Sequence, residues 1–150
     1  LYSVMFVVVG VLTFSQALKL EAGAGGATLV SLMRDEFIDM GVPIILVIAA
    51  LPFVSGFVTG LAVGFVGASF PLVFGLLGAD PALNQVVATT IFAYSFGYMG
   101  MILSPVHICF VVTNEYFKTR LFRAYPYLLG PVASILVAAL FLSGLAYSIL

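Results

Sequence analysis

The stretch from Met40 to Ala79 reads MGVPIILVIAALPFVSGFVTGLAVGFVGASFPLVFGLLGA and contains no charged side chain in 40 residues. A helix that crosses the hydrocarbon core of a bilayer, roughly 30 Å thick, needs about 20 apolar residues. At about 1.5 Å per residue, a straight helix of this length would run to roughly 60 Å, about twice that thickness. The chain is therefore expected to turn back or break inside this stretch.

The composition of the whole chain places this stretch in a membrane protein. The 150 residues include 5 Lys and Arg and 6 Asp and Glu, and 63% are hydrophobic. Charged residues make up 7%, against about a quarter in soluble domains, and the mean hydropathy is +1.27. Further uncharged stretches cover 1–18, 81–114 and 124–150. We predict an all-α fold, a polytopic transmembrane helical bundle.

The same residues exclude several classes of function. Cys109 is the one cysteine of the chain, which excludes a disulfide-rich secreted scaffold. The chain has no basic face, which excludes a nucleic-acid partner. It also lacks the zinc-binding and phosphate-loop motifs and has no pair of intramembrane carboxylates. We therefore expect no enzymatic activity, no catalytic residues, no metal site and no cofactor.

The turn inside 42–77 has several candidate positions. Proline removes a backbone donor and clashes with the preceding helical turn, and glycine-rich neighbours favour irregular backbone. The candidates are Pro52, Ser55-Gly56, Thr59-Gly60 and Pro71. The segment is expected to form either a re-entrant hairpin, which enters and leaves on one face of the membrane, or two full spans.

A second interruption is predicted in the 34 uncharged residues of 81–114. As one helix they would extend about 51 Å. Ser104-Pro105 divides this stretch, so we expect a span over 85–113 that is interrupted near 104–105, with a long helix before the break and a short one from Val106 to Thr113.

The remaining segments complete the membrane topology. Further spans are predicted at 1–18 and 126–149, the latter with Tyr125 and Tyr127 as aromatic anchors at the headgroup level. Residues 28–39 have apolar positions at helical spacing, which predicts either an amphipathic helix on the membrane surface or a solvated helical turn between two spans.

The charges of the last loop give an orientation. Lys118, Arg120 and Arg123 favour a cytoplasmic position for the loop 115–124. The chain is apolar from Leu1, without an initiator Met or a signal-peptide pattern. We therefore expect a single transmembrane domain that is part of a longer protein.

Small and hydroxyl-bearing residues gather in the first long uncharged stretch. Gly56, Gly60 and Gly64 are spaced by four, which predicts a stripe on one helix that lets backbones approach closely. Ser55, Thr59 and Ser69 add hydroxyls that a cation or carboxylate site would use. The alternatives are a packing stripe and hydroxyls that bond back to their own helix.

His107 is the one ionisable side chain, apart from tyrosines and Cys109, inside the long uncharged stretches. An ionisable group at membrane depth is a candidate functional residue, and imidazole can titrate near neutral pH. The alternative is a neutral histidine satisfied by a backbone carbonyl. Pro105, two residues earlier, frees the carbonyl of Met101, and such groups can coordinate a cation in broken helices of transporters.

The run Ser104-Pro-Val-His-Ile-Cys-Phe-Val-Val-Thr-Asn-Glu-Tyr-Phe117, with Pro52 to Gly60 and Gly67 to Pro71, resembles DUF401, an uncharacterised family of multi-spanning prokaryotic membrane proteins. That family is related by similarity to the ion-transporter superfamily of citrate, dicarboxylate and gluconate-type permeases. The resemblance implies an inner or plasma membrane protein built from inverted repeats, each with a re-entrant hairpin and a broken helix. This chain would be the C-terminal half.

The resemblance also implies where a solute and a coupling ion would bind. Characterised relatives carry Ser-Asn-Thr-like signatures at the hairpin tip and the helix break. No such triplet stands out here, and Ser55-Gly56 and Thr89-Thr90 are weaker substitutes, so neither the substrate nor the choice of Na⁺ or H⁺ as coupling ion follows. The predicted substrate or ion-binding residues are Ser55, Gly56, Thr59, Gly60, Ser69, Thr89, Thr90, Ser104, Pro105 and His107.

Three functional hypotheses follow. The first is a secondary transporter, or half of one, for a small anionic solute, working by alternating access. The second is a structural membrane subunit without transport activity. The third is a rhomboid-like intramembrane hydrolase with Ser69 as nucleophile and His107 as base, although Phe70 replaces the second glycine of that motif. Expected partners are the lipid bilayer, a small-molecule solute, the missing N-terminal half of the same protein and a second copy in a homodimer.

Overall fold

The computed structural model describes residues 29–78 and 80–149, together with Met5, Val9, Gly10, Thr13, Phe14, Gln16 and Ala17. The predicted span at 1–18 lies outside the described residues except for these isolated positions, which are helical.

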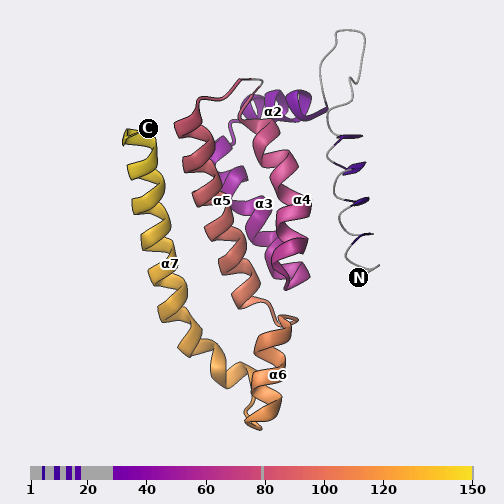
Figure 1. The fold of residues 1–150 in the computed structure, drawn as a ribbon, viewed down its shortest axis with the longest axis vertical. Helices are drawn as coiled ribbons and strands as arrows, with labels where there is room; N and C mark the ends of the chain where they lie inside the picture. Colours follow the sequence, from indigo (N-terminus) through magenta and orange to yellow (C-terminus); the bar gives the residue numbers. More distant parts are fainter. Residues whose placement is uncertain are drawn as a thin grey trace.

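The regular structure in the described ranges is α-helical, which confirms the predicted fold class (Figure 1). The helices are, in chain order, α2 (Leu29–Asp39), α3 (Ile44–Thr59), α4 (Ala62–Leu76), α5 (Leu83–Leu103), α6 (Ile108–Tyr116) and α7 (Leu121–Ile149). Two helical segments of the described part are long and apolar enough to cross a membrane, Leu83–Tyr116 and Leu121–Ile149. A third span results if α2 and α3, bent by 118°, are counted as one.

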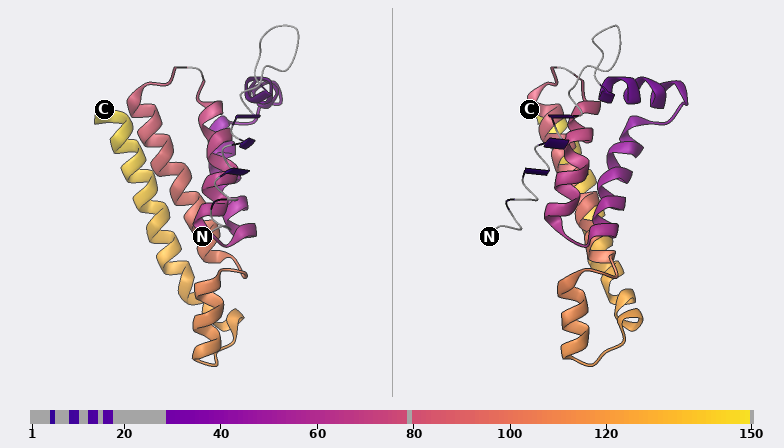
Figure 2. Two further views of the ribbon diagram at one scale, coloured as in Figure 1. Left: turned by 45° about the vertical axis from the view of Figure 1, so that its right-hand side comes forward. Right: turned by 90° about the vertical axis from the view of Figure 1, so that its right-hand side faces the viewer.

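Helices α3 and α4 form an antiparallel hairpin whose turn lies at Gly60 and Leu61 (Figures 1 and 2). Their 16 and 15 residues correspond to roughly 24 and 22 Å, less than the hydrocarbon thickness of about 30 Å. The turn lies at Thr59-Gly60, one of the predicted positions, because α3 ends at Thr59 and α4 begins at Ala62. Breaks at Pro52, Ser55-Gly56 and Pro71 were wrong predictions, because α3 and α4 continue through these residues.

The predicted glycine stripe is also corrected by this turn. Gly56 lies in α3, Gly60 adopts a left-handed φ of 62° at the turn, and Gly64 lies in α4. The three glycines therefore belong to different elements and cannot form one stripe along a single helix.

A glycine seam joins α3 to α5. A Cβ atom added to Gly56 would collide with the carbonyl oxygen of Gly97, and one added to Gly100 would collide with the carbonyl oxygen of Phe53. The two backbones therefore touch at two successive turns, an approach that only residues without a side chain permit. The seam holds α3 against the C-terminal part of α5.

The second interrupted element is present as predicted. Helix α5 ends at Leu103 and α6 begins at Ile108, so the break covers Ser104 to His107 and the short helix starts two residues later than expected. The last helix begins at Leu121, earlier than the predicted 126, and contains Pro126 and Pro131. Both prolines lie near its N-terminal end, where α7 is visibly bent (Figure 2).

The core lies between α3, α4 and α5. Val47, Ile48, Val73, Leu76 and Ala93 are buried there. Helix α2 covers the end of this cluster with Phe37, while its acidic residues Asp35, Glu36 and Asp39 are exposed. The helix expected at 28–39 is therefore present and amphipathic, and it lies across one end of the bundle (Figure 1).

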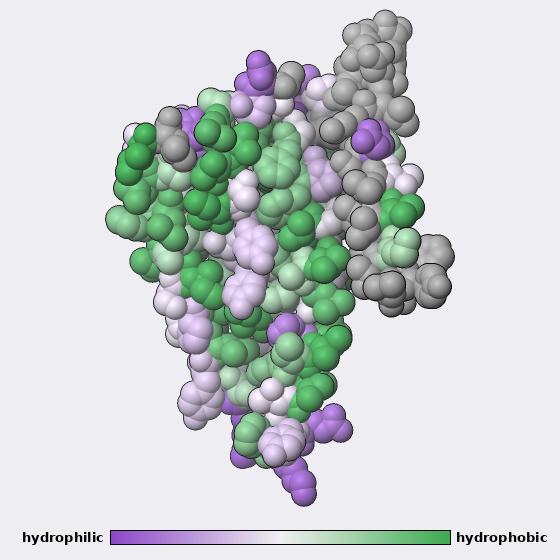
Figure 3. Space-filling model, viewed as in Figure 1, coloured by the Kyte–Doolittle hydropathy of each residue, from purple (hydrophilic) through white to green (hydrophobic). Residues whose placement is uncertain are grey.

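The outer surface has the character of a membrane protein. Apolar side chains cover most of the middle of the visible face, and charged ones gather at the two ends (Figure 3). Helix α7 exposes many large apolar side chains, among them Val137 and Phe141. An apolar exterior of this extent is suited to contact with lipid.

Candidate functional site

The tip of the α3–α4 hairpin meets the break between α5 and α6. The ring Nδ1 of His107 lies 2.9 Å from the carbonyl oxygen of Gly60, and because a carbonyl only accepts, Nδ1 carries the proton. The position of a Cβ on Gly60 lies 3.0 Å from the His107 nitrogen and 3.0 Å from the Val106 carbonyl carbon. The two segments are therefore in backbone contact, and we call this contact the tip–break junction.

The break is a compact turn built around Pro105. The Ser104 backbone N–H donates to the Met101 carbonyl at 3.1 Å, and the Ser104 carbonyl accepts from the His107 N–H at 3.2 Å. The Ser104 hydroxyl accepts a hydrogen bond from the Val106 N–H at 3.3 Å. Ser104 is 0% exposed. Proline has no N–H to continue the α5 ladder, so the serine supplies the local bonds that hold the break in one shape.

Helix α7 contributes a residue that was predicted for another role. The hydroxyl of Tyr125 donates at 3.1 Å to the carbonyl of Leu103, the last residue of α5, and its ring packs edge-on against Phe110 with centroids 5.3 Å apart. Tyr125 thus satisfies a carbonyl freed by the break, a role that was not predicted from the sequence. Tyr127 is 82% exposed, as an anchor would be. The sequence signal that could have indicated the role of Tyr125 is the predicted break itself, because a broken helix leaves carbonyls that need hydrogen-bond donors from another segment.

Four helix ends converge on the tip–break junction. Helices α3 and α5 end there, and α4 and α6 begin there. Neither Leu61 nor His107, the residues that precede α4 and α6, supplies a side-chain cap. Helix N-termini carry partial positive charge and C-termini partial negative charge, so the junction can attract an anion at two of its ends and a cation at the other two.

The hydroxyls predicted near the tip bond to their own helix. The Ser55 hydroxyl donates to the Pro52 carbonyl at 3.2 Å, and that of Thr59 donates to the Ser55 carbonyl at 2.7 Å. Both residues lie in the last turns of α3, next to the junction. Thr59 also lies 3.3 Å from the carbonyl of Leu61, across the turn.

Ser69 lies away from the tip and is part of the core. Its hydroxyl donates to the Phe65 carbonyl at 2.6 Å, and it is 2% exposed. It lies seven residues into α4 from Ala62, roughly 10 Å along the axis. The described bonds of Ser69 and His107 go to backbone carbonyls, an arrangement unlike that of a nucleophile and its base.

Thr89 and Thr90 lie near the opposite end of α5. They precede Ser104 by about 14 residues, which is roughly 21 Å of helix. The Thr90 hydroxyl donates to the Val86 carbonyl at 2.6 Å, and Thr89 lines a separate cavity beside α2. The structure therefore brings Gly60, Ser104, Pro105 and His107 together, and Gly56 takes part in the glycine seam instead.

Charged metal ligands do not form a group at the junction. In the described ranges no cluster of three or more His, Cys, Asp or Glu side chains is placed to hold a metal ion. The polar groups available there are helix ends, backbone carbonyls, the imidazole and hydroxyls.

A model of the family described as a protein of unknown function, DUF401, matches residues 2–150. No curated protein and no solved structure shows significant similarity to the chain.

Proposed function

The chain belongs to the DUF401 family, described as of unknown function, and we propose that it acts in the membrane as a secondary transporter, or half of one, for a small anionic solute. The observation that carries the proposal is the tip–break junction, in which a hairpin tip and a broken helix meet through His107 and Gly60. In secondary transporters, interrupted helices of this kind hold the solute and the coupling ion near the middle of the bilayer.

The charge arrangement supports an anionic solute. The N-termini of α4 and α6 direct partial positive charge at the junction, and neither is neutralised by a side-chain cap. The uncharged stretches contain no Asp or Glu that would repel an anion there. A small carboxylate is the chemical class that fits two helix N-termini and one imidazole.

The coupling ion is Na⁺ or H⁺ in this proposal. The ends of α3 and α5 carry partial negative charge, which suits Na⁺. The carbonyls of Met101 and Leu103 already accept bonds from Ser104 and Tyr125, so Na⁺ would use their second lone pairs. His107 offers the other route, because its Nδ1 is engaged with Gly60 and its Nε2 is the nitrogen that can accept a proton.

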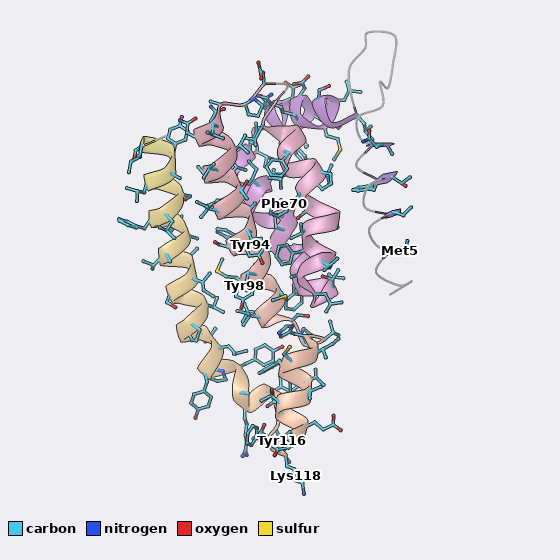
Figure 4. The ribbon with its side chains drawn as sticks, in the orientation of Figure 1. Met5, Phe70, Tyr94, Tyr98, Tyr116 and Lys118 are labelled. Carbon is cyan, nitrogen blue, oxygen red and sulfur yellow. The ribbon has the colours of Figure 1, made fainter. Side chains whose placement is uncertain are left out.

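The proposal includes a protein partner and an orientation. Tyr94 and Tyr98 are exposed halfway along α5 (Figure 4), where their hydroxyls need a protein or water partner at membrane depth. The N-terminal half of the protein, or a second copy, would cover this face. The positive loop that follows Tyr116 would be cytoplasmic.

Uptake into proteoliposomes tests the transport function. The protein, expressed from its complete coding sequence, is reconstituted and supplied with radiolabelled mono-, di- and tricarboxylates under an imposed Na⁺ gradient or an imposed pH gradient. We expect accumulation of at least one carboxylate that collapses when the driving gradient is dissipated. Protein-free liposomes are the control. Folded protein that accumulates no carboxylate under either gradient would overturn the proposal in favour of a structural subunit.

A further inference from the structure

A cavity of about 500 Å³ lies between α2, α3, α5 and α7, at the end of the bundle away from the tip–break junction. Its volume is within the range of about 300 to 1,000 Å³ that is typical of ligand sites. Its lining is mostly apolar, with the side chain of Arg34 at one border. The cavity is separate from the proposed transport site at the tip–break junction.

Small residues form part of the cavity wall on α5 and α7. Helix α5 contributes Ala88 and Thr89, and α7 contributes Ser143 and Gly144, each pair at the centre of a stripe with helical spacing. Side chains of this size leave open the space that larger side chains would occupy at the cavity wall. Phe92, one turn deeper on α5, continues the apolar wall. An elongated apolar group can therefore lie along α5 in the cavity, bordered by α3 and α7.

Arg34 gives the cavity a charged border. Its Nε is buried and has no hydrogen-bond partner, and its Nη1 lies 3.1 Å from the position of a Cβ on Gly78, at the end of α4. A buried polar group without a partner is costly and points to a ligand or water that completes it. The acidic neighbours Asp35 and Glu36 are exposed, and neither provides the missing partner of the Arg34 Nε.

The position of Arg34 in the bundle identifies the class of ligand. Helix α2, with its exposed acids, lies across the end of the bundle, at the level where the apolar surface gives way to charge (Figures 1 and 3). An arginine at this border meets lipid headgroups, and the apolar cavity beside it extends toward hydrocarbon depth. We propose that the cavity binds an anionic lipid, with Arg34 on the headgroup and an acyl chain along α5, bordered by α3 and α7.

The absence of tryptophan from the sequence allows a direct test. Phe92→Trp places one fluorophore in the cavity wall, and Phe141→Trp places one on α7, 68% exposed to lipid. Both residues lie about nine residues from the same bundle end, hence at similar depth. The full protein is reconstituted with dibromostearoyl phosphatidylglycerol, which is anionic, or with the matching phosphatidylcholine, and quenching gives the relative affinity.

We expect the Phe92→Trp signal to report a preference for phosphatidylglycerol of about fivefold, as one arginine contact implies. The Phe141→Trp signal should show a ratio of about one, as expected for lipid that contacts no buried charge. Adding Arg34→Gln to Phe92→Trp should remove the preference, whereas Arg34→Lys should keep it. Arg120→Gln, at the other end of the bundle, is the charge control and should have no effect.

Three results would overturn this site. Equal quenching by the two lipids at Phe92→Trp would show that the cavity does not recognise the anionic headgroup. A preference that survives Arg34→Gln would show that a residue other than Arg34 recognises it. Absence of quenching by either lipid at that position, with normal quenching at Phe141→Trp, would show that protein fills or covers the cavity. None of these results depends on whether the protein transports a solute.

Discussion

The imidazole of His107 donates a hydrogen bond of 2.9 Å to the carbonyl of Gly60, which lies 47 residues earlier in the chain. This bond fixes which ring nitrogen carries the proton and joins the tip of one interrupted element to the break in the other. The bond to a backbone carbonyl that the sequence alternative described is therefore present, and it involves Nδ1 rather than Nε2.

Two substitutions of His107 distinguish its hydrogen bond to Gly60 from its ability to carry a proton. His107→Asn keeps a donor near the place of Nδ1 and removes the titratable group, whereas His107→Ala removes both. We expect His107→Ala to lower the free energy of unfolding by about 1 kcal/mol and His107→Asn to lower it less, as measured by denaturation in detergent. If H⁺ is the coupling ion, His107→Asn loses uptake driven by a pH gradient. Unchanged pH-driven uptake in that variant would show that H⁺ coupling does not pass through His107.

Substitutions of Gly60, at the hairpin tip, and of Gly41, which serves as the control, test the contact between the tip and the break. Both have positive φ, 62° and 71°, but a Cβ on Gly41 meets nothing within 4 Å. Alanine at either position costs about 1 to 2 kcal/mol of backbone strain. Gly60→Ala should cost more, because its Cβ also presses on Val106 and His107, and it should reduce uptake. Equal stability losses in the two variants would show that the tip does not press on the break.

The glycine seam predicts a second contrast, between Gly100 and Gly130. A Cβ on Gly100 collides with the Phe53 carbonyl, whereas one on Gly130 of α7 meets nothing within 4 Å. Gly100→Ala should destabilise the protein by about 1 to 3 kcal/mol through forced separation of the helices. Gly130→Ala should be neutral or slightly stabilising, since alanine favours helix. Thermal unfolding of the two variants in the same detergent measures the difference.

Tyr125 and Tyr127 allow removal of one hydroxyl at a time. Tyr125→Phe deletes the donor to the Leu103 carbonyl and should lower stability by about 1 kcal/mol. Tyr127→Phe removes an exposed hydroxyl and should change stability by less than about 0.5 kcal/mol. A Tyr125→Phe protein as stable as the wild type would mean that water or another donor satisfies the carbonyl equally well.

The interrupted elements could be predicted because they follow from length and proline chemistry. A charge-free stretch of 40 residues exceeds one bilayer crossing, and Pro105 cannot continue the hydrogen bonds of α5. The position of the hairpin turn did not follow, because Pro52, Pro71 and Thr59-Gly60 are locally similar interruptions. The chain turns at Gly60, where a left-handed glycine allows close contact with the break, and that contact is tertiary.

The site residues divide in the same way. Ser104, Pro105 and His107 were identified because they are adjacent in the chain, and they remain adjacent in the fold. Thr89 was grouped with them by residue type alone, but it lies about 21 Å away along α5. The role of Tyr125 depends on the path of α7 past the end of α5, which no pattern within α7 reveals.

The glycine seam has a mechanical consequence. Gly56 of α3 packs against the Gly97 carbonyl of α5, and Gly100 of α5 packs against the Phe53 carbonyl of α3. Each helix therefore has a carbonyl that packs against a glycine of the other helix. Interlocked backbones of this kind resist sliding, because any shift of α3 along α5 drives a carbonyl into a Cα of the opposite helix. We therefore expect the hairpin and the long half of the broken helix to stay together as one unit. In the proposed transport cycle, any movement at the junction would then fall on the boundaries with α6 and α7.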